Sequence, residues 1–305
     1  MHLSFALALS SLVLTLTQSF TLNQKQSIGK SKQLAMSNAN EKEEGIFLLS
    51  NMDQISIDGP KRLILASQSP RRREILDMIG LKDKYSVIPS PLDEGKLQIK
   101  LSKMNMSPQD YTKVLAEEKA NALAEHLVSM DYSDDDNCET TFILGSDTIV
   151  DLGGKILEKP TSSENAIEML QSLSNNWHEV HTGVALYRIQ HQKSQTFKQV
   201  DCVTSYTDTS KVKFSSLSMR DIEAYVKTGE PMDKAGSYGI QVSAMCYQFT
   251  KIIGFELIFS YFILSYTKGI GGQFVEEMIG DFFTIMGLPM NSLSREISKA
   301  LKSDT

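Results

Sequence analysis

The chain has 305 residues, of which 41% are hydrophobic, and its formal net charge at pH 7 is −6. This content is sufficient for a substantial core, and the length allows one large domain or two small ones. The negative charge argues against general nucleic-acid binding, which requires a basic surface, so any anion site must be a local basic pocket. Three cysteines, Cys138, Cys202 and Cys246, lack metal-like spacing and cannot all pair, so we expect free thiols.

Residues 1–60 are predicted to lie outside the folded domain. Residues 3–16 form an apolar stretch that is too short for a membrane span but similar in length to a signal-sequence core. A polar, lysine-containing stretch follows with no acidic residue before Glu41, and this combination suits an organelle address of the plastid type. A plain disordered extension on a cytoplasmic protein is the alternative. Residues 41–60 are glutamate-rich, end in Asp-Gly-Pro and are predicted to be a linker.

Residues 62–80 carry the most informative pattern of the chain. The apolar run 63–66 predicts a buried strand. A helix is expected to follow, with Ser69 as its N-cap and Pro70 in its first turn. Three arginines, residues 71–73, lie in that turn, where the helix dipole disfavours cations. A bound anion, held by free N–H groups, hydroxyls and guanidinium groups, would explain them; a solvated basic face is the alternative.

The rest of the chain alternates predicted strands with predicted helices, which indicates an α/β fold. Strands are predicted over residues 85–89, 142–150, 155–158, 178–189 and 197–214, with one or two more over 274–286. Helices are predicted over residues 107–127, 161–173, 218–229 and 292–302. We expect a capping box of Thr161 and Glu164 at the start of the second of these helices.

Asp147 interrupts an otherwise apolar strand, Phe-Ile-Leu-Gly-Ser-Asp-Thr-Ile-Val. A carboxylate in such surroundings is costly unless it is paired, hydrogen-bonded or bound to a metal ion. One interpretation is therefore a functional carboxylate. The alternative is a buried acid that pairs with a nearby lysine.

A series of segments in the same order resembles the Maf-like nucleoside triphosphate pyrophosphatases of the dTTP/UTP type. They cover about residues 60–300 apart from one block. The segments are Ser67-Gln-Ser-Pro-Arg-Arg-Arg-Glu-Ile-Leu, Ala-Glu-Glu-Lys-Ala around Lys119, Gly145-Ser-Asp-Thr-Ile-Val, Glu158-Lys-Pro, residues 178–186, residues 228–241 and residues 280–289. The resemblance implies one domain over residues 61–303, with a Maf/ITPase-like fold: an elongated central mixed sheet, flanking helices and an active-site cleft between two lobes.

The resemblance also implies roles for individual residues. Asp147 is implied to accept the proton of the attacking water, and Lys119 and Lys159 to neutralise phosphate charge. Glu94, with Asp147, is implied to bind a divalent cation, Mg²⁺ or Mn²⁺, since such ions prefer oxygen ligands. The implied substrate-binding and specificity residues are Ser67, Ser69, Arg71, Arg72, Thr148 and Gln241. Without the resemblance, Lys119 and Lys159 would be interpreted as solvated lysines and Glu94 as an ordinary loop acid. Gln241 would be interpreted as a glutamine that satisfies backbone groups.

The implied reaction is hydrolysis of dTTP, UTP and modified pyrimidine nucleotides to the monophosphate and pyrophosphate, which cleanses the nucleotide pool. The alternative is a nucleotide-binding regulator without turnover, because family members are linked to septum formation and cell-division arrest. The acids and lysines named above favour the enzyme, since a pure binder has no need of a water-activating acid. We expect a nucleoside triphosphate as partner, no nucleic acid and no stable membrane span, and the resemblance leaves a homodimer open.

Residues 242–268 depart from the family pattern. In the family, the segment that ends at Gln241 continues at once into a glycine-rich turn, which stands here at residues 269–275. The block is rich in Phe, Tyr and Ile, and it is too short and too charged to be a convincing membrane helix. Its removal restores Gly-Ile-Gln-Gly-Ile-Gly-Gly without a frame change. We therefore interpret the block as an insertion, with a retained intron as the hypothesis and a membrane-associating insertion as the alternative.

Overall fold

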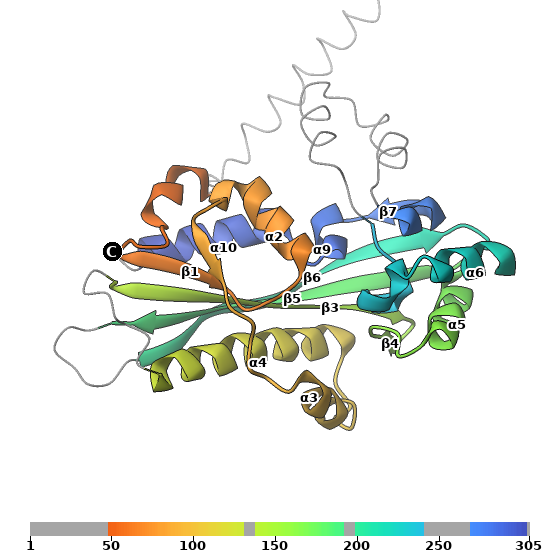
Figure 1. The fold of residues 1–305 in the computed structure, drawn as a ribbon, viewed down its shortest axis with the longest axis horizontal. Coiled ribbons are helices and arrows are strands. Elements are labelled where there is room, and N and C mark those ends of the chain that lie inside the picture. Colours follow the sequence, from red (N-terminus) through yellow and green to blue (C-terminus); the bar gives the residue numbers. More distant parts are fainter. Residues whose placement is uncertain (1–47, 131–137, 192–198, 241–268, 304–305) are drawn as a thin grey trace, which may run out of the picture. The chain divides into compact units, whose positions relative to one another are not determined.

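A computed structural model describes residues 48–130, 138–191, 199–240 and 269–303, which belong to one compact unit, Phe47–Thr305. Seven strands form one sheet in the order β2-β1-β3-β5-β6-β7, and β4 pairs with β3 (Figure 1). The pairs β1–β2 and β1–β3 are parallel, and the others are antiparallel. The predicted α/β fold, a mixed central sheet flanked by helices, is confirmed.

The strands are β1 (Lys61–Leu65), β2 (Tyr85–Val87), β3 (Thr140–Leu152), β4 (Lys155–Leu157), β5 (Trp177–Gln190), β6 (Gln199–Phe214) and β7 (Val275–Ile279). The α-helices are α2 (Pro70–Leu76), α3 (Glu94–Leu101), α4 (Pro108–Ser129), α5 (Ser163–Leu173), α6 (Met219–Lys227), α9 (Phe282–Met286) and α10 (Met290–Ser303). Shorter helical turns are η1 (Leu48–Ser50), η2 (Met52–Gln54), η3 (Asp77–Leu81), η4 (Glu230–Asp233), η5 (Ala235–Ser237) and η6 (Ile270–Phe274).

Helix α4 lies on one face of the sheet, and α2, α9 and α10 lie on the other (Figure 1). Two strand glycines let α4 approach to backbone contact. A Cβ atom on Gly145 would lie 2.3 Å from the carbonyl oxygen of Ala116, and one on Gly183 would lie 2.3 Å from that of Thr112. No side chain fits at either position, so glycine sets the depth at which α4 sits on β3 and β5.

The edge of β3 is open in its middle. Strand β1 pairs with β3 only as far as Leu144, and β4 begins its pairing at Val150. Between them, residues 145–149 have no neighbouring strand on that side among the described residues. Asp147 lies in this gap, next to the end of the parallel strand β1, which is where ligands commonly bind to open α/β sheets.

The folded unit begins earlier than the composition predicts. Residues 48–60, expected to be linker, form η1 and η2, and their side chains Leu48 and Ile55 are each only 1% exposed. Ile55 forms a parallel bridge with Lys61, and the Asn51 amide donates to the hydroxyl of Ser298 at 2.8 Å. The apolar residues of this stretch enter the core beside α10, and the prediction of a linker rests on the glutamates that precede it, at residues 41–44.

Residues 274–286, expected to form strands throughout, divide into β7 and the helix α9. Asp281 caps α9 by accepting a hydrogen bond from the N–H of Phe283 at 3.0 Å. Gly287 ends the helix with φ of 113°, a value that favours glycine. The run Phe-Phe-Thr-Ile-Met is short and apolar apart from Thr284, so its periodicity does not separate a buried strand from a buried helix.

Two helix starts also differ from expectation. Ser162, not Thr161, is the N-cap of α5, and its hydroxyl accepts from the N–H of Asn165 at 3.2 Å. Asp93 and Glu94, expected in a loop, begin α3: the Asp93 carboxylate accepts from the N–H of Lys96 at 3.1 Å.

Several predictions concern residues outside the described ranges. They are the targeting-like segment within residues 1–47, the block 242–268, Cys246 and the specificity residue Gln241. In the part of the chain that the structure does describe, no helix is both long enough and apolar enough to cross a membrane.

Candidate active site

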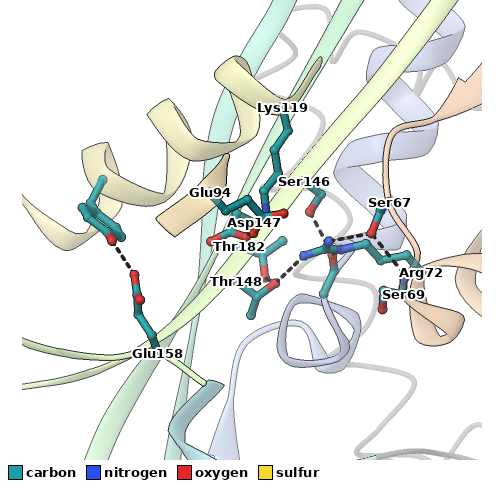
Figure 2. Close-up of polar contacts among 12 residues, drawn as sticks. Ser67, Ser69, Arg72, Glu94, Lys119, Ser146, Asp147, Thr148, Glu158 and Thr182 are labelled. Atoms are coloured by element: carbon teal, nitrogen blue, oxygen red, sulfur yellow. Dashed lines mark hydrogen bonds and ion pairs between the residues drawn. The ribbon is translucent and has the colours of Figure 1, made fainter. Parts of the chain in front are cut away.

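Arg72, in the first turn of α2, is a buried cation with neutral partners. Its guanidinium group donates to Ser67 Oγ at 2.9 Å, to the carbonyl oxygen of Gly287 at 3.0 Å and to Thr148 Oγ1 at 3.4 Å (Figure 2). Among the described residues, no carboxylate forms an ion pair with it. Burial lowers the pKa of Arg72, and the charge of Asp147 partly opposes this effect. A charge buried in this way favours a bound anion.

Lys119 of α4 reaches across to β3 and α3. Its ammonium nitrogen lies 2.5 Å from Asp147 Oδ1 and 2.9 Å from Glu94 Oε2 (Figure 2). Lys119 is buried, the Asp147 side chain is 15% exposed and that of Glu94 is 46% exposed. The buried acid therefore does pair with a lysine. However, the lysine is shared with a second carboxylate, and both carboxylates border a cavity.

Glu158, at the end of β4, is a further carboxyl group near this cluster. It accepts a hydrogen bond from the hydroxyl of Tyr111 on α4. Burial raises the pKa of Glu158, the Tyr111 hydrogen bond lowers it, and the negative charge of Asp147 raises it further; the net pKa is above the ordinary value. The sequence motif Glu-Lys-Pro contains this residue, but nothing in the sequence predicts its pairing with Tyr111.

A cavity of about 420 Å³ lies over the open edge of β3. The structure brings to it nine of the residues singled out in the sequence: Ser67, Ser69, Arg71, Arg72, Glu94, Lys119, Asp147, Thr148 and Lys159. The tenth, Gln241, is outside the described residues, although its chain neighbour Ile240 lines the cavity. The volume lies within the range usual for small-molecule sites.

Residues 233–235 and 238–240 line the cavity as well, although within the segment 228–241 sequence reasoning assigned a role to Gln241 alone. Asp233 and Lys234 form an ion pair at 2.6 Å, and Asp233 lies 3.8 Å from a guanidinium nitrogen of Arg71. Tyr238 lines the cavity too. The signal that could have found these residues is their position in the motif Thr-Gly-Glu-Pro-Met-Asp-Lys-Ala-Gly-Ser-Tyr-Gly-Ile-Gln.

The cavity is locally basic in an acidic protein. Its charged lining consists of five basic side chains and three carboxylates: Arg71, Arg72, Lys119, Lys159 and Lys234, with Glu94, Asp147 and Asp233. The acidic and basic groups are not evenly mixed, because two carboxylates converge on Lys119 while Arg72 has only neutral partners. The arrangement suits a polyanion that is accompanied by a metal ion.

Glu94 and Asp147 fit a divalent cation. One oxygen of each carboxylate lies within hydrogen-bond distance of the same ammonium nitrogen, so the two oxygens converge on one point. Mg²⁺ is commonly bound by one or two carboxylates together with substrate phosphates. Among the described residues, Asp147 Oδ2 takes part in no hydrogen bond or ion pair, so this second oxygen is available for other chemistry.

Comparison with known proteins gives consistent results. The family described as Maf-like protein matches residues 62–256. The chain is 35% identical over 236 residues to the dTTP/UTP pyrophosphatase of Clostridium perfringens strain SM101. The matched residues make up 77% of this chain and 95% of that protein. It is 37% identical over 230 residues to the dTTP/UTP pyrophosphatase of Clostridium tetani, and the match covers 75% of this chain and 93% of that protein.

A human protein also matches. It is described as "Probable bifunctional dTTP/UTP pyrophosphatase/methyltransferase protein", and it is 37% identical over 240 residues, or 78% of this chain. The chain spans only about a third of that protein's length, since 32% of it is covered.

Proposed function

The chain belongs to the Maf-like protein family, and we propose that it is an enzyme that hydrolyses nucleoside triphosphates, dTTP and UTP above all, to the monophosphate and pyrophosphate. Modified pyrimidine nucleotides belong to the same proposed substrate class. The names of the bacterial relatives support this proposal. The alternative of a regulator without turnover is not favoured, because the cavity retains a carboxylate suited to water activation.

One observation carries the proposal. Two cationic side chains line the same cavity: Arg72, whose buried guanidinium group has no carboxylate partner in the described part of the chain, and Lys119, which two carboxylates share. A triphosphate with its divalent cation suits both side chains. Its phosphate oxygens would supply negative charge to Arg72, and the carboxylates that share Lys119 would bind the cation. A neutral ligand would leave Arg72 without a counter-ion.

In the proposed reaction, a water oxygen attacks the α-phosphorus, and the bond from that phosphorus to the oxygen of the β-phosphate breaks. Pyrophosphate leaves and the monophosphate remains. Asp147 accepts the proton of the attacking water, through Oδ2. A divalent cation held by Glu94 and Asp147 would reduce the repulsion between the phosphates and the nucleophile. Arg71, Lys159 and Lys119 neutralise the charge that develops on the phosphate oxygens.

We propose that the base is read at the end of the cavity lined by Tyr238, Gly239 and Ile240, next to Gln241 in the chain. A glutamine amide can both donate to and accept from the Watson–Crick edge of a pyrimidine. Thr148 is proposed to act through its neighbours, because its hydroxyl lies 2.9 Å from that of Thr182 and contacts Arg72.

A substrate panel tests the proposal. The chain, with and without residues 242–268, is incubated with dTTP, UTP, CTP, ATP or GTP in Mg²⁺ or Mn²⁺, and the products are separated. We expect dTTP and UTP to be hydrolysed fastest, to monophosphate and pyrophosphate. Nucleoside diphosphate and orthophosphate as products would contradict the assigned bond. If the form without residues 242–268 hydrolysed none of these triphosphates, the proposal that the protein is an enzyme would be contradicted.

We also propose that residues 242–268 are an insertion into a single domain. The support is local. A Cβ atom on Gly269 would lie 2.5 Å from the carbonyl oxygen of Gly239, so the segments on either side of the block are in contact. The Glu230 carboxylate links them, accepting from the N–H of Ile270 and from the hydroxyl of Tyr225, each at 3.1 Å. Dimer formation stays a prediction.

A further inference from the structure

Three side chains with metal-ligand chemistry meet on the α4 face of the sheet, outside the cavity. Asp151 stands opposite Glu179 in the β3–β5 register, and His181 stands opposite Ile149. Alternate strand residues share a face, so the three side chains point to the same side. One potential ligand atom from each lies within 4.8 Å of those of the other two. We propose that they bind a divalent transition-metal ion of the zinc class.

This site is separate from the proposed catalytic cation. None of its three residues lines the cavity. Asp151 is four residues beyond Asp147 on β3, which corresponds to about 13 Å along a strand. The inference therefore does not depend on the proposed hydrolysis.

The distances suit an intervening ion better than direct hydrogen bonds. His181 Nε2 lies 3.5 Å from Asp151 Oδ2 and 3.6 Å from Glu179 Oε2. Good N–H···O bonds have separations of about 2.7–3.2 Å. Ligand atoms placed about 2.0–2.1 Å from a tetrahedral Zn²⁺ stand roughly 3.3 Å from one another. The two distances from His181 to the carboxylates are thus close to the spacing that a shared ion requires.

Each of the three side chains is held by a partner outside the trio, through the atom that does not face the other two. These contacts join Thr209 Oγ1 to His181 Nδ1 at 2.8 Å, Gly154 N to Asp151 Oδ1 at 2.6 Å, and Lys211 Nζ to Glu179 Oε1 at 3.1 Å. Such outer contacts orient metal ligands in proteins. If Nδ1 donates to Thr209, Nε2 directs its lone pair towards the two carboxylate oxygens.

Burial favours the neutral form of His181, which is also the form that binds a metal ion. His181 is fully buried, and burial lowers its pKa, although Asp151 and Glu179 partly oppose the effect. A neutral imidazole is the form that binds metal ions. The amide nitrogen of Gln109 lies 3.4 Å from His181 Nε2, in agreement with an accepting Nε2. With a neutral histidine, Lys211 is the one basic side chain among the described residues that forms an ion pair with either carboxylate.

The donor set selects the ion. One imidazole nitrogen and two carboxylate oxygens suit Zn²⁺ and Co²⁺, whereas Mg²⁺ and Ca²⁺ prefer oxygen ligands throughout. A bound ion would tie β3 to β5 and, through Thr209, to β6, under the start of α4 where Gln109 lies. We therefore expect it to stabilise the fold rather than to take part in hydrolysis.

The test uses the full chain with excess Mg²⁺, so that the oxygen-ligand site is occupied. Co²⁺ serves as a visible probe, and Zn²⁺ is added during thermal unfolding. The variants are Glu179→Gln alone and Asp151→Asn with Glu179→Gln, and Glu277→Gln, an exposed carboxylate on β7, is the control. We expect the wild type and the control to bind one more Co²⁺ than the double variant, with a visible absorption band.

Zn²⁺ should raise the melting temperature of the wild type and the control, and each Glu179 variant should bind it at least tenfold more weakly. The single variant keeps Asp151 and His181, so it remains informative if the double variant folds poorly. Equal Co²⁺ binding by wild type and variants would overturn the proposal. So would a melting temperature that responds to pH but not to Zn²⁺, because His181 would then be a protonated partner of the carboxylates.

Discussion

The ammonium nitrogen of Lys119 lies 2.5 Å from Asp147 Oδ1, so the proposed general base forms an ion pair with a lysine of the same cavity. Phosphate oxygens that bind Lys119 would weaken this pair at the moment when a proton has to be accepted. Substrate binding and activation of the base are thereby linked through one lysine.

Replacing Asp147 by asparagine should remove turnover while leaving the fold intact. The amide has the same shape but cannot accept a proton, so we expect kcat to fall by about 10²- to 10⁴-fold. Pyrophosphate release measures the effect. The control is Glu276→Gln, which breaks a surface ion pair with Lys213 at 2.9 Å, away from the cavity. Full turnover by Asp147→Asn would show that another group activates the water.

Replacing Arg72 by lysine should weaken triphosphate binding. A single ammonium cannot reproduce the contacts of the guanidinium group to Ser67, Gly287 and Thr148. We expect KM to rise at least about tenfold, as the loss of one charged hydrogen bond would produce. Pyrophosphate should also raise the melting temperature less than in the wild type. The control is Arg73→Lys, the exposed neighbour that does not line the cavity; equal effects of both changes would contradict an anion site at Arg72.

Replacing Glu158 by glutamine should stabilise the protein increasingly as the pH rises. The pKa of Glu158 is raised in the folded state, so the folded state binds its proton more tightly than the unfolded chain does. The stabilisation of the wild type by this tighter proton binding is fully present below the ordinary glutamate pKa. It is lost as the pH rises through the raised pKa of Glu158 in the folded state. The difference in melting temperature between variant and wild type should therefore grow from pH 4 to pH 8, with the exposed Glu168→Gln as control. A constant difference would contradict the raised pKa.

Replacing Gly183 by alanine should destabilise the fold and slow turnover. The added methyl group would meet the carbonyl oxygen of Thr112 at 2.3 Å, so α4 must move. We expect a loss of about 1–3 kcal/mol in the free energy of unfolding, with a lower kcat because α4 carries Lys119. Gly95→Ala on α3 is the matched control, since a Cβ atom at position 95 would lie 3.7 Å from its nearest neighbour, Asp93 Oδ1. Denaturant unfolding of both variants separates the clash from a general effect of alanine.

Joining Gln241 directly to Gly269 should give a folded protein. The segments before and after the block are already in contact through Gly239, Gly269 and Glu230. We expect an unchanged or higher melting temperature and pyrophosphatase activity at least equal to that of the full chain. An unfolded deletion variant would contradict the interpretation as an insertion. Transcripts that are uniformly unspliced would contradict the intron hypothesis alone.

The sequence predicts those parts of the site that depend on local pattern. The apolar strand around Asp147 and the arginines at the start of α2 are local features, and the structure has them where expected. Ser69 takes the expected N-cap position, but its hydroxyl makes no cap hydrogen bond. The Tyr111–Glu158 and Arg72–Gly287 contacts join residues that are 47 and 215 positions apart, so no local pattern contains them. The pattern does not predict α9, because a short, mainly apolar run has no distinctive period. It does not predict the core residues Leu48 and Ile55 either, because the glutamates at 41–44 make the whole stretch 41–60 look like a linker.

The bond from Arg72 to the carbonyl of Gly287 has a consequence for synthesis of the protein. Gly287 follows Arg72 by 215 residues, so it is translated long after the arginine. A nascent or prematurely terminated chain that lacks Gly287 has no complete cradle for the anion. We therefore expect triphosphate binding to weaken in a chain that stops shortly before Gly287, because Arg72 then keeps only its contacts to Ser67 and Thr148.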